Sequence, residues 1–344
     1  MIALDQLDAA LAGFGLQRTG AVVPLAAGTL NRNYVVTTQS GKQVLRSIRP
    51  DQPALAIAAE HAAIAWAGAR DIPVAQPLRR RIDAQLARAG GELPDTCVVL
   101  ADGSRWAAFP FIVGRLPVRG AVTERQVAAL GDMHGRLHAV LAIHPQSSGA
   151  RFAMRWDRAG SCAVLAAAEN AARAARAEPQ VIAAIALQHD LLEREPVLDP
   201  ADFAHLPCQM LHGDYHDAQV LLDDGDRVAA VLDWELFQAG ARIWELIRAL
   251  AFMDLLEHEL LATYLSAYVC HVRLTPAECA AGMALWWQSR LGGAWVWSAY
   301  FLQGNTRVET LFDSTIATLH KLAQPGWRTA VTQRFCAAVA VAQA

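Results

Sequence analysis

The sequence predicts an α+β protein of two lobes, with a small antiparallel sheet and one main helix over about residues 1–113 and a mainly helical part over 114–344. Short apolar runs separated by turn residues fill the first part. Ala- and Leu-rich stretches at helical spacing fill the second. A chain of 344 residues that is 54% hydrophobic and 18% charged is large and apolar enough to bury a core in each lobe.

The first part alternates between turn signals and short strands, apart from two helical stretches. A small, polar segment that contains Gly28 separates the first two strands, and such a loop lets backbone N–H groups approach a phosphate closely. An ordinary hairpin would look the same, so this signal alone is weak. We expect helices at 4–16 and 54–69, and strands at 22–25, 34–38, 43–46, 73–78, 97–100 and 106–113.

Beyond Gly114 the pattern becomes helical, with segments at 123–141, 158–177 and 180–195 and mostly helix after residue 240. His134 and His138 lie four positions apart, on one face of the first of these helices. That spacing can bind a metal, but the apolar residues around it are typical of a core helix.

One stretch carries most of the chemical information. Residues 211–235 read LHGDYHDAQVLLDDGDRVAAVLDWE, in which two apolar runs flank the turn residues 223–226. This pattern predicts a short hairpin. Its outer ends then bring together Asp214 and Asp233, which are 19 positions apart in the sequence. Two carboxylates and a polar side chain suit a divalent metal and a proton acceptor, which are the requirements of phosphoryl transfer.

The same residues resemble a known catalytic core. The run His212-Gly213-Asp214-Tyr215-His216, then Gln219 and Asp233-Trp234-Glu235, is similar to that of the aminoglycoside phosphotransferase family. This family includes choline kinases and has the protein-kinase-like fold. The resemblance extends over about residues 25–250 and is nearest to the type II homoserine kinase and stress-kinase-like branches.

The resemblance implies an ATP- and Mg²⁺-dependent phosphotransferase. Asp214 is then the residue that orients the acceptor hydroxyl and takes its proton, and Asp233 holds the main Mg²⁺. Gln219 stands where the family has Asn and is expected to take the second metal-facing position. His212 belongs to the catalytic motif and is expected to bond the backbone of the loop.

The resemblance also implies a nucleotide site in the first lobe. Gly28, Asn31 and Asn33 match the family's segment Gly-x-x-Asn-x-Asn-Tyr next to the phosphates. Arg46 occupies the strand position of the kinase phosphate-binding cation, and Glu60 is its expected partner on the following helix.

The remaining candidates are placed by the resemblance or by local pattern. Phe109 and Phe111 lie where the family links its lobes and binds adenine, although core packing would explain them equally. His216, Glu235 and Arg290 are candidates for contacting the acceptor, which would be a homoserine-like amino alcohol, a choline-like compound or a sugar.

Departures from the family pattern keep an alternative open. Gln219 replaces Asn, Arg46 replaces the Lys of protein kinases, and Glu245 replaces an Asp that braces the catalytic loop. A degenerate kinase fold that only binds nucleotide or regulates a partner would show such changes, and a protein Ser/Thr kinase of the stress-kinase-like branch is a further possibility.

Composition argues against several other classes. A net charge of −3 does not indicate binding to nucleic acid or to an anionic membrane. No apolar run reaches the length of a membrane span, and residues 1–20 do not resemble a secretory signal. The six cysteines are scattered without metal-ligand spacing. We therefore expect a cytoplasmic protein, whose oligomeric state the sequence does not indicate.

Overall fold

The computed structural model describes residues 4–25, 31–81, 93–153, 157–196 and 198–344. Contacts between residues divide the chain into two compact units, one of residues 1–144 and 211–238, the other of residues 145–210 and 239–344. The segment with the predicted hairpin thus packs with the N-terminal sheet. A boundary between lobes at residue 113 stays a prediction.

The first unit is built on an antiparallel sheet, as predicted, and this sheet has five strands in the order β1-β2-β3-β5-β4. Strands β2 and β3 are joined by a tight turn, in which Gly41 has the φ angle of +97° that glycine adopts readily. The strands are β1 (Arg18–Leu25), β2 (Arg32–Thr38), β3 (Gly41–Ile48), β4 (Val98–Val99) and β5 (Arg105–Pro110).

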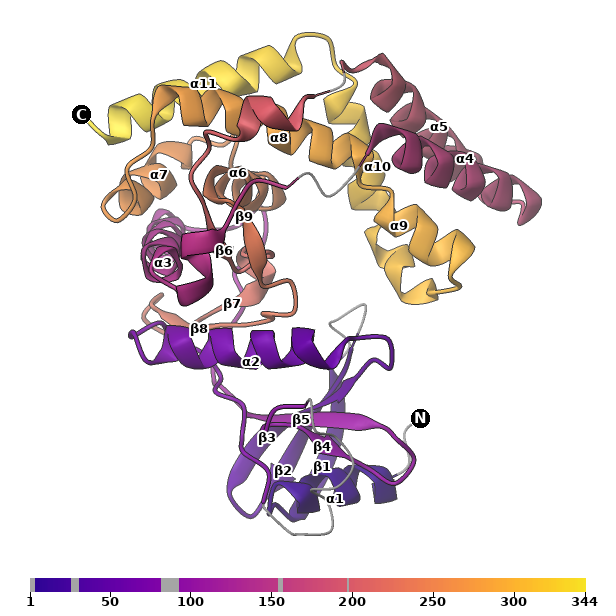
Figure 1. The fold of residues 1–344 in the computed structure, drawn as a ribbon, viewed down its shortest axis with the longest axis vertical. Coiled ribbons are helices and arrows are strands. Elements are labelled where there is room, and N and C mark those ends of the chain that lie inside the picture. Colours follow the sequence, from indigo (N-terminus) through magenta and orange to yellow (C-terminus); the bar gives the residue numbers. More distant parts are fainter. Residues whose placement is uncertain (1–3, 26–30, 82–92, 154–156, 197) are drawn as a thin grey trace. The chain divides into compact units, whose positions relative to one another are not determined.

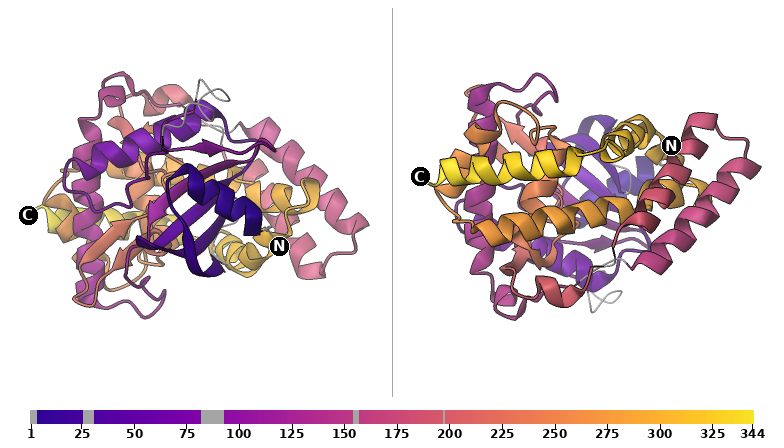
Figure 2. Two further views of the ribbon diagram at one scale, coloured as in Figure 1. Left: turned by 90° about the horizontal axis from the view of Figure 1, so that it is seen from below. Right: turned by 90° about the horizontal axis from the view of Figure 1, so that it is seen from above.

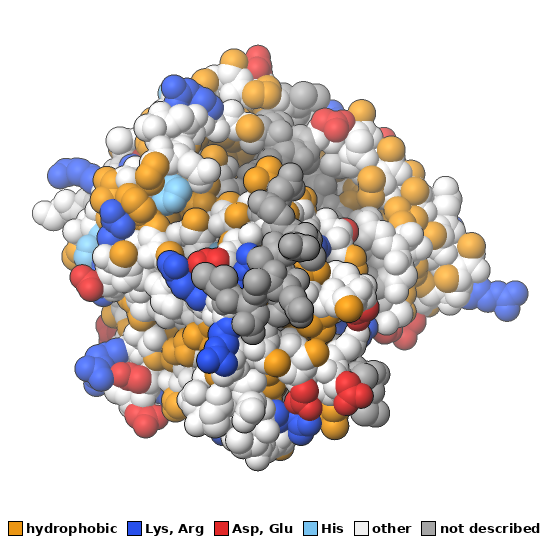
Figure 3. All heavy atoms as spheres, turned by 60° about the horizontal axis from the view of Figure 1, so that its bottom comes forward, with side chains coloured by type: hydrophobic (Ala, Val, Ile, Leu, Met, Phe, Trp, Pro, Cys, Tyr) orange, Lys and Arg blue, Asp and Glu red, His pale blue; other side chains and the backbone are white. Residues whose placement is uncertain are grey.

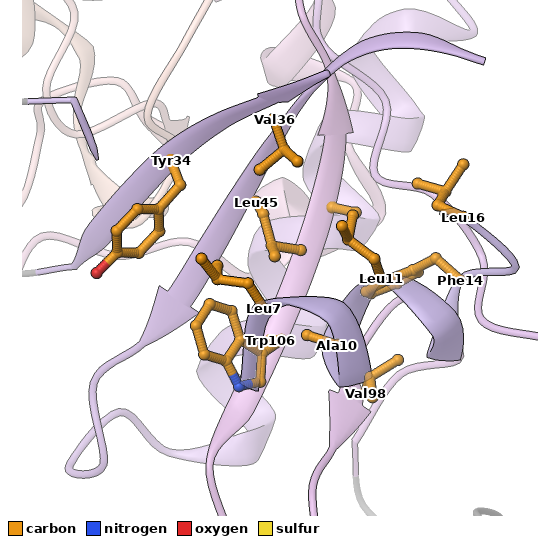
Figure 4. Close-up of a cluster of buried hydrophobic side chains, with 11 residues drawn as sticks. Leu7, Ala10, Leu11, Phe14, Leu16, Tyr34, Val36, Leu45, Val98 and Trp106 are labelled. Atoms are coloured by element: carbon orange, nitrogen blue, oxygen red, sulfur yellow. The ribbon is translucent and has the colours of Figure 1, made fainter. Parts of the chain in front are cut away.

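Helix α1 (Leu4–Gly13) covers one face of this sheet (Figures 2 and 4). Its apolar side chains recur at helical spacing, so that Leu7 and Leu11 both point toward the strands. There they join a buried cluster that includes Leu45 of β3 and Trp106 of β5. Burial of this face fixes α1 on the sheet, because a short helix gains little stability from its own hydrogen bonds.

Helix α2 (Ala54–Gly68) carries a buried stripe of mixed chemistry. Ile57 and Ile64 lie at the two ends of this buried stripe, and Glu60 and His61 lie between them. The four residues have the i, i+3, i+4, i+7 spacing of one helix face. Buried polar groups require partners. Those of Glu60 are described with the site below, and Nδ1 of His61 lies 2.6 Å from Oγ1 of Thr96.

The prediction of a strand at 73–78 is wrong. Only Val74 forms a bridge there, parallel to Val231. Pro73 and Pro77 have no N–H to donate, so this segment cannot continue a ladder. It is held by single backbone bonds instead, from Leu78 N to Ala108 O at 2.8 Å and from Val231 N to Pro73 O at 2.7 Å.

Three further elements complete the first unit: helix α3 (Glu124–Ala142) and the strands β7 (Val220–Leu222) and β8 (Val228–Val231). Helix α3 begins with a capping box, in which Thr123 and Gln126 satisfy each other's backbone N–H groups. A short 3₁₀ turn, Asp217–Gln219, precedes β7.

The second unit is mainly helical. In the right-hand view of Figure 2, α8 and α11 run side by side, and contacts between them agree with this. Strands β6 (Cys208–Leu211) and β9 (Gln238–Ala241), all but one residue of each in this unit, pair in a small sheet. Its helices, labelled in Figure 1, are α4 (Arg158–Ala174), α5 (Pro179–Arg194), α6 (Arg242–Phe252), α7 (Leu261–Val269), α8 (Pro276–Gly292), α9 (Trp295–Trp297), α10 (Phe312–Leu322) and α11 (Trp327–Ala342).

Among the described residues, no helix combines the length and apolar character that crossing a bilayer requires. On the face drawn in Figure 3, basic and acidic side chains are interspersed rather than gathered by sign.

We predict that His61 makes the protein sensitive to acid. Its pKa is lowered to about 4 by burial and, secondarily, by the positive charge of Arg46. In the unfolded chain it takes up a proton near pH 6.5, so stability falls as pH decreases from about 6.5 to 4, by up to about 3 kcal/mol. Replacement of His61 by Gln should remove most of this loss.

Urea unfolding at about pH 7 and about pH 4.5 measures the difference. The exposed residue His320 provides the control, since His320→Gln should leave the pH dependence unchanged. An acid loss of equal size in His61→Gln and in the wild type would contradict the assignment.

Candidate active site

The predicted hairpin is present and holds its outer ends together. Strands β7 and β8 pair in antiparallel register, with Val220 opposite Val231. The ladder continues one step further, because Leu232 N donates to Gln219 O at 2.8 Å. The loop that contains Asp214 and the residue Asp233 therefore emerge at the same end of the hairpin.

His212 joins the two sides of this end. Its Nε2–H donates to Leu232 O at 2.8 Å, and its Nδ1 accepts from Asp214 N at 3.2 Å. The ring is fully buried, with its centroid 4.8 Å from that of Trp234. Because backbone groups engage both ring nitrogens, this geometry suits a brace between the loop and the residue before Asp233, as the sequence suggested.

Gly213 and Tyr215, the neighbours of Asp214 in the sequence, fit closely against their surroundings. Gly213 has a φ angle of +88°, and a Cβ atom there would lie 2.0 Å from Leu236 O, so only glycine fits. The Tyr215 hydroxyl donates to Leu130 O of α3 at 2.8 Å, and its ring stacks on His134 at 4.3 Å between centroids. These contacts fix the loop on both sides of Asp214.

Asp214 itself is mostly buried, with 18% of its side chain exposed. Gln219 Nε2 donates to its Oδ2 at 3.4 Å, and His216 Nε2 lies 3.6 Å from its Oδ1. The amide of Gln219 thus turns its nitrogen toward Asp214, which directs its oxygen away from that carboxylate.

The ion pair of Arg119 and Asp217 lies next to His216, on the side away from Asp214's contact with Nε2. Arg119 binds both oxygens of Asp217, at 3.0 Å through Nε and 2.8 Å through Nη2. Oδ1 of Asp217 also lies 3.1 Å from Nδ1 of His216. Burial alone would raise the pKa of Asp217, but His216 and Arg119 outweigh it and hold the pKa below its ordinary value. A chain of contacts therefore runs from Arg119 through Asp217 and His216 to Asp214.

Arg46 lies at the centre of the other half of the site. Its Nη1 binds Glu60 Oε1 at 2.7 Å, its Nε donates to Asn33 Oδ1 at 3.2 Å, and its Nη2 lies 3.9 Å from Asp233 Oδ1. Burial would lower the pKa of Arg46, but the neighbouring carboxylates, Glu60 first, raise it overall. The strand, the helix and the hairpin end thus meet at one guanidinium group, and Glu60 is its partner as predicted.

Glu235 connects the end of the hairpin to the start of β2. Its Oε2 accepts from Asn31 Nδ2 at 2.7 Å, and its Oε1 lies 2.9 Å from Arg49 Nη2. Asn31 Oδ1 in turn accepts from the backbone N–H of Arg49 at 2.9 Å. Gly28, the other residue expected at the phosphates, lies outside the described residues. Glu235 therefore ties the end of the hairpin to Asn31 and Arg49, and its contact with the acceptor stays a prediction.

Asp233 belongs to a cluster of three carboxylates, with Glu60 and Glu235, and two guanidinium groups, those of Arg46 and Arg49. The pKa of Glu235 is raised to about 7 by burial first, with the charges of Asp233 and Glu60 adding to the effect and Arg49 and Arg46 opposing it. Asp233 is 40% exposed at its side chain and has a φ angle of +58°, an uncommon conformation for Asp.

This chemistry fits a hard cation. Carboxylate and amide oxygens are the ligands that Mg²⁺ prefers, and Asp233 and Gln219 offer both kinds at the same end of the hairpin. The excess of carboxylates around Asp233 would be offset by such an ion.

The other candidates have more ordinary surroundings. Phe109 is buried in β5, with the Arg46 guanidinium 5.1 Å from its ring centroid and His61 edge-on at 5.8 Å. Phe111 is half-buried, with Lys42 Nζ 5.6 Å from its ring centroid. Phe109 therefore supports Arg46 as a core residue would. Arg290 lies on α8 of the second unit.

Sequence reasoning missed Arg119, Asp217 and Arg49. Asp217 directly follows the motif at 212–216, so its carboxylate next to His216 could have been predicted to contact that histidine. Arg119 is 98 positions from Asp217 and offers no local pattern that points to it.

Comparisons with solved structures show a kinase-like fold. An amicoumacin kinase in complex with AMP-PNP and Ca²⁺ matches with 15% identity and a TM-score of 0.58, covering 96% of this chain and 93% of that one. A microcompartment-associated aminopropanol kinase matches with 16% identity and a TM-score of 0.56, covering 99% and 97%. A choline/ethanolamine kinase family protein from Mesorhizobium loti matches with 18% identity and a TM-score of 0.55, covering 98% and 99%.

No curated protein matches the chain. A sequence model of the phosphotransferase enzyme family, however, matches residues 21–281, about three quarters of the chain. The matched range includes most of the five-stranded sheet, the Arg46–Glu60 pair and the whole β7–β8 hairpin. The chain therefore belongs to the phosphotransferase enzyme family.

Proposed function

We propose that this phosphotransferase uses ATP and Mg²⁺ to phosphorylate a hydroxyl group of a small molecule. The observation that carries the proposal is the pairing of the two hairpin strands, which places Asp214, Gln219 and Asp233 at one end of the hairpin. Nη2 of Arg46 lies 3.9 Å from Oδ1 of Asp233 there. A proton acceptor, oxygen ligands for a cation and a phosphate-binding guanidinium are the parts that phosphoryl transfer requires.

In this mechanism Asp214 accepts a hydrogen bond from the acceptor hydroxyl and takes its proton as the reaction proceeds. The hydroxyl oxygen forms a bond to the γ-phosphorus while the bond to the oxygen that bridges the β- and γ-phosphates breaks, and ADP leaves. Gln219 and His216 hold the Asp214 carboxylate at the contacts described above. Catalysis then rests on positioning, since transfer from ATP requires little covalent chemistry of the protein.

Asp233 and Gln219 would hold Mg²⁺, which supplies positive charge to the phosphate oxygens when it is bound. Arg46, kept in place by Glu60 and Asn33, would contact the phosphates. Gly28 and Asn31 remain candidates for binding the phosphates, and the region of Phe109 and Phe111 would receive the adenine.

The acceptor is proposed to be a small amino alcohol or a related compound, such as a homoserine-like, choline-like or sugar-like molecule. The similar structures include kinases named for amicoumacin and for aminopropanol, which supports this class of substrate.

Replacement of Asp214 by Asn should abolish transfer but not nucleotide binding, because Asn cannot take the proton and the Arg46 centre is unchanged. We expect kcat to fall by about 10²–10⁴-fold, the usual contribution of a general base. Coupled-assay turnover and calorimetric titration with ATP measure the two quantities. Asp224→Asn, at an exposed position in the hairpin turn, is the matched control. Near-normal turnover by Asp214→Asn would refute the role.

Asp233 should control the effect of the metal on nucleotide binding. ATP with Mg²⁺ at about 100 times its dissociation constant should stabilise the wild type by about 2.7 kcal/mol, a melting shift of a few degrees. In Asp233→Asn the additional shift due to Mg²⁺ should disappear, whereas Asp214→Asn should keep it. An unchanged Mg²⁺ effect in Asp233→Asn would exclude this residue as the metal ligand, and GTP in place of ATP tests nucleotide choice.

The pair Arg119–Asp217 should position His216 and, through it, Asp214. We expect Arg119→Met to lower kcat about 10-fold and to leave the ATP dissociation constant unchanged, because the contacts described above lead from the pair to His216 and Asp214 and not to Arg46. It should also destabilise the fold by about 2 kcal/mol, since Asp217 stays buried without its cation, and adding Asp217→Asn should restore part of that stability.

Arg115→Met is the matched control, since Arg115 lies in the same segment and pairs with Asp226 of the hairpin turn. If Arg119→Met and Arg115→Met changed kcat equally, the contacts through Asp217 would have no specific part in positioning Asp214.

A further inference from the structure

Helices α4 and α5 of the second unit pack against each other as an antiparallel pair (Figure 1), and three side chains of different chemistry meet there. Cys162 comes from the second turn of α4, and His189 and Glu193 come from the last two turns of α5. A thiol sulfur, an imidazole nitrogen and a carboxylate oxygen of these residues all lie within 4.8 Å of one another. All three residues belong to the second unit, so the cluster depends only on how these two helices pack.

The buried stripes of the two helices explain why the side chains meet. Each member of the cluster directly follows a buried residue in the sequence, namely Ser161 in α4, and Gln188 and Leu192 in α5. One residue is a step of about 100° around a helix, and because the helices are antiparallel this step leads to the same side of their contact. The cluster therefore lies at the edge of the contact, where the thiol and the imidazole are half-buried and the carboxylate is exposed.

Ordinary structural roles explain the cluster only in part. Nε2 of His189 lies 3.7 Å from Oε1 of Glu193, one helical turn away, but such a pair at a surface adds little stability. A cysteine at a contact between helices usually serves as a small apolar side chain. Neither role explains why the Cys162 sulfur lies with an imidazole and a carboxylate rather than among apolar groups.

One cation also belongs to these surroundings. Burial first, and then the charge of Glu193, raise the pKa of Cys162, whereas the charge of Arg158, one helical turn earlier on α4, lowers it. The thiol is therefore not activated in the way of a catalytic or redox-active cysteine. Nη2 of Arg158 is buried and has no hydrogen-bond partner among the described residues. It is thus available to donate to a thiolate, as groups around metal ligands commonly do.

We propose that Cys162, His189 and Glu193 bind a Zn²⁺ ion that links α4 to α5, with water as the fourth ligand. Sulfur, imidazole nitrogen and carboxylate oxygen are the ligands that Zn²⁺ takes in proteins, whereas a thiolate does not suit Mg²⁺ or Ca²⁺. Ligand atoms around a tetrahedral Zn²⁺ lie about 3.3–3.8 Å apart, so small rotations of these side chains would complete the site.

Binding exchanges a proton for the metal. The S–H bond of Cys162 breaks, its electron pair forms the bond to Zn²⁺, and the proton leaves to solvent. The thiolate and the carboxylate then balance the two charges of the ion, which offsets the unfavourable effect of Arg158 on a nearby cation. None of the three ligands belongs to the candidate active site, so this site does not depend on the proposed function.

The first test uses Co²⁺ as a spectroscopic substitute for Zn²⁺, because a thiolate bound to Co²⁺ gives an intense charge-transfer band in the near ultraviolet. Titration of the reduced protein should produce this band with one ion per chain, and Zn²⁺ but not Mg²⁺ should remove it by displacement. Cys162→Ala should lack the band. Cys270→Ala, which removes an exposed thiol at the end of α7, should keep it. Co²⁺ on the oxygen ligands proposed for Mg²⁺ would give no such band.

The other two ligands are tested by the affinity for Co²⁺. Glu193→Gln and His189→Gln should each weaken binding at least about 10-fold, since even groups that only orient metal ligands contribute that much. Asp190→Asn is the matched control, because it removes an exposed carboxylate of the same helix that pairs with Arg194. If Glu193→Gln and Asp190→Asn bound Co²⁺ with equal affinity, the site with three protein ligands would be overturned.

The second test measures the link between the helices. Zn²⁺ should raise the melting temperature of the wild type but not that of Cys162→Ala, and with a chelator present the two proteins should melt alike. Where Cys162→Ala fails to fold, His189→Gln, at a half-buried surface position, takes its place in this comparison. A wild type without the thiolate band, a band of equal strength in Cys162→Ala, or an equal Zn²⁺ shift in wild type and variant would each overturn the zinc site.

Discussion

A single buried guanidinium group determines how the first unit is assembled. Arg46 comes from the middle of the sheet, and burying its charge would be prohibitive without partners. Glu60 and Asn33 bind it directly, Asp233 lies within 4 Å, and the ring of Phe109 supports it. Helix α2 and the end of the hairpin are therefore not free to settle elsewhere on the sheet, since moving either would leave a buried charge uncompensated.

The loop around Asp214 is held by a second set of constraints, which depend on shape as much as on charge. The side chain of His212 ties the loop to Leu232, and Gly213 passes so close to Leu236 that no side chain fits. Tyr215 anchors the following residue to α3. Asp214 thus sits on a short piece of backbone fixed at both ends, as expected of a group whose geometry must be set before substrate arrives.

Local pattern predicted the parts of the site that lie close together in the sequence. The apolar runs around the turn at 223–226 defined the hairpin, and the hairpin implied the proximity of Asp214 and Asp233. The resemblance to phosphotransferases supplied Arg46 and Glu60, which the structure brings together.

Interactions between distant segments could not be predicted in this way. Asn31 and Glu235 are 204 positions apart, and although the resemblance made each a candidate for the site, nothing in the sequence paired them with each other. The pairing of Arg119 with Asp217, 98 positions apart, could not be predicted from the sequence either. The strand expected at 73–78 does not form for a different, local reason, because Pro73 and Pro77 cannot donate to a ladder. The packing of the hairpin with the N-terminal sheet is also a tertiary property, and the spacing of hydrophobic residues in the sequence does not predict it.

The division of the chain has a consequence for the way the protein is made. The first unit takes its last segment from residues 211–238, after 66 residues that belong to the second unit. During synthesis the sheet and α2 leave the ribosome long before Asp233 can reach Arg46. Until then, the buried guanidinium has only part of its native surroundings. The N-terminal segment therefore stays partly folded until residues 211–238 have been synthesised. Partly folded segments are more prone to aggregation and depend more on chaperones than native proteins.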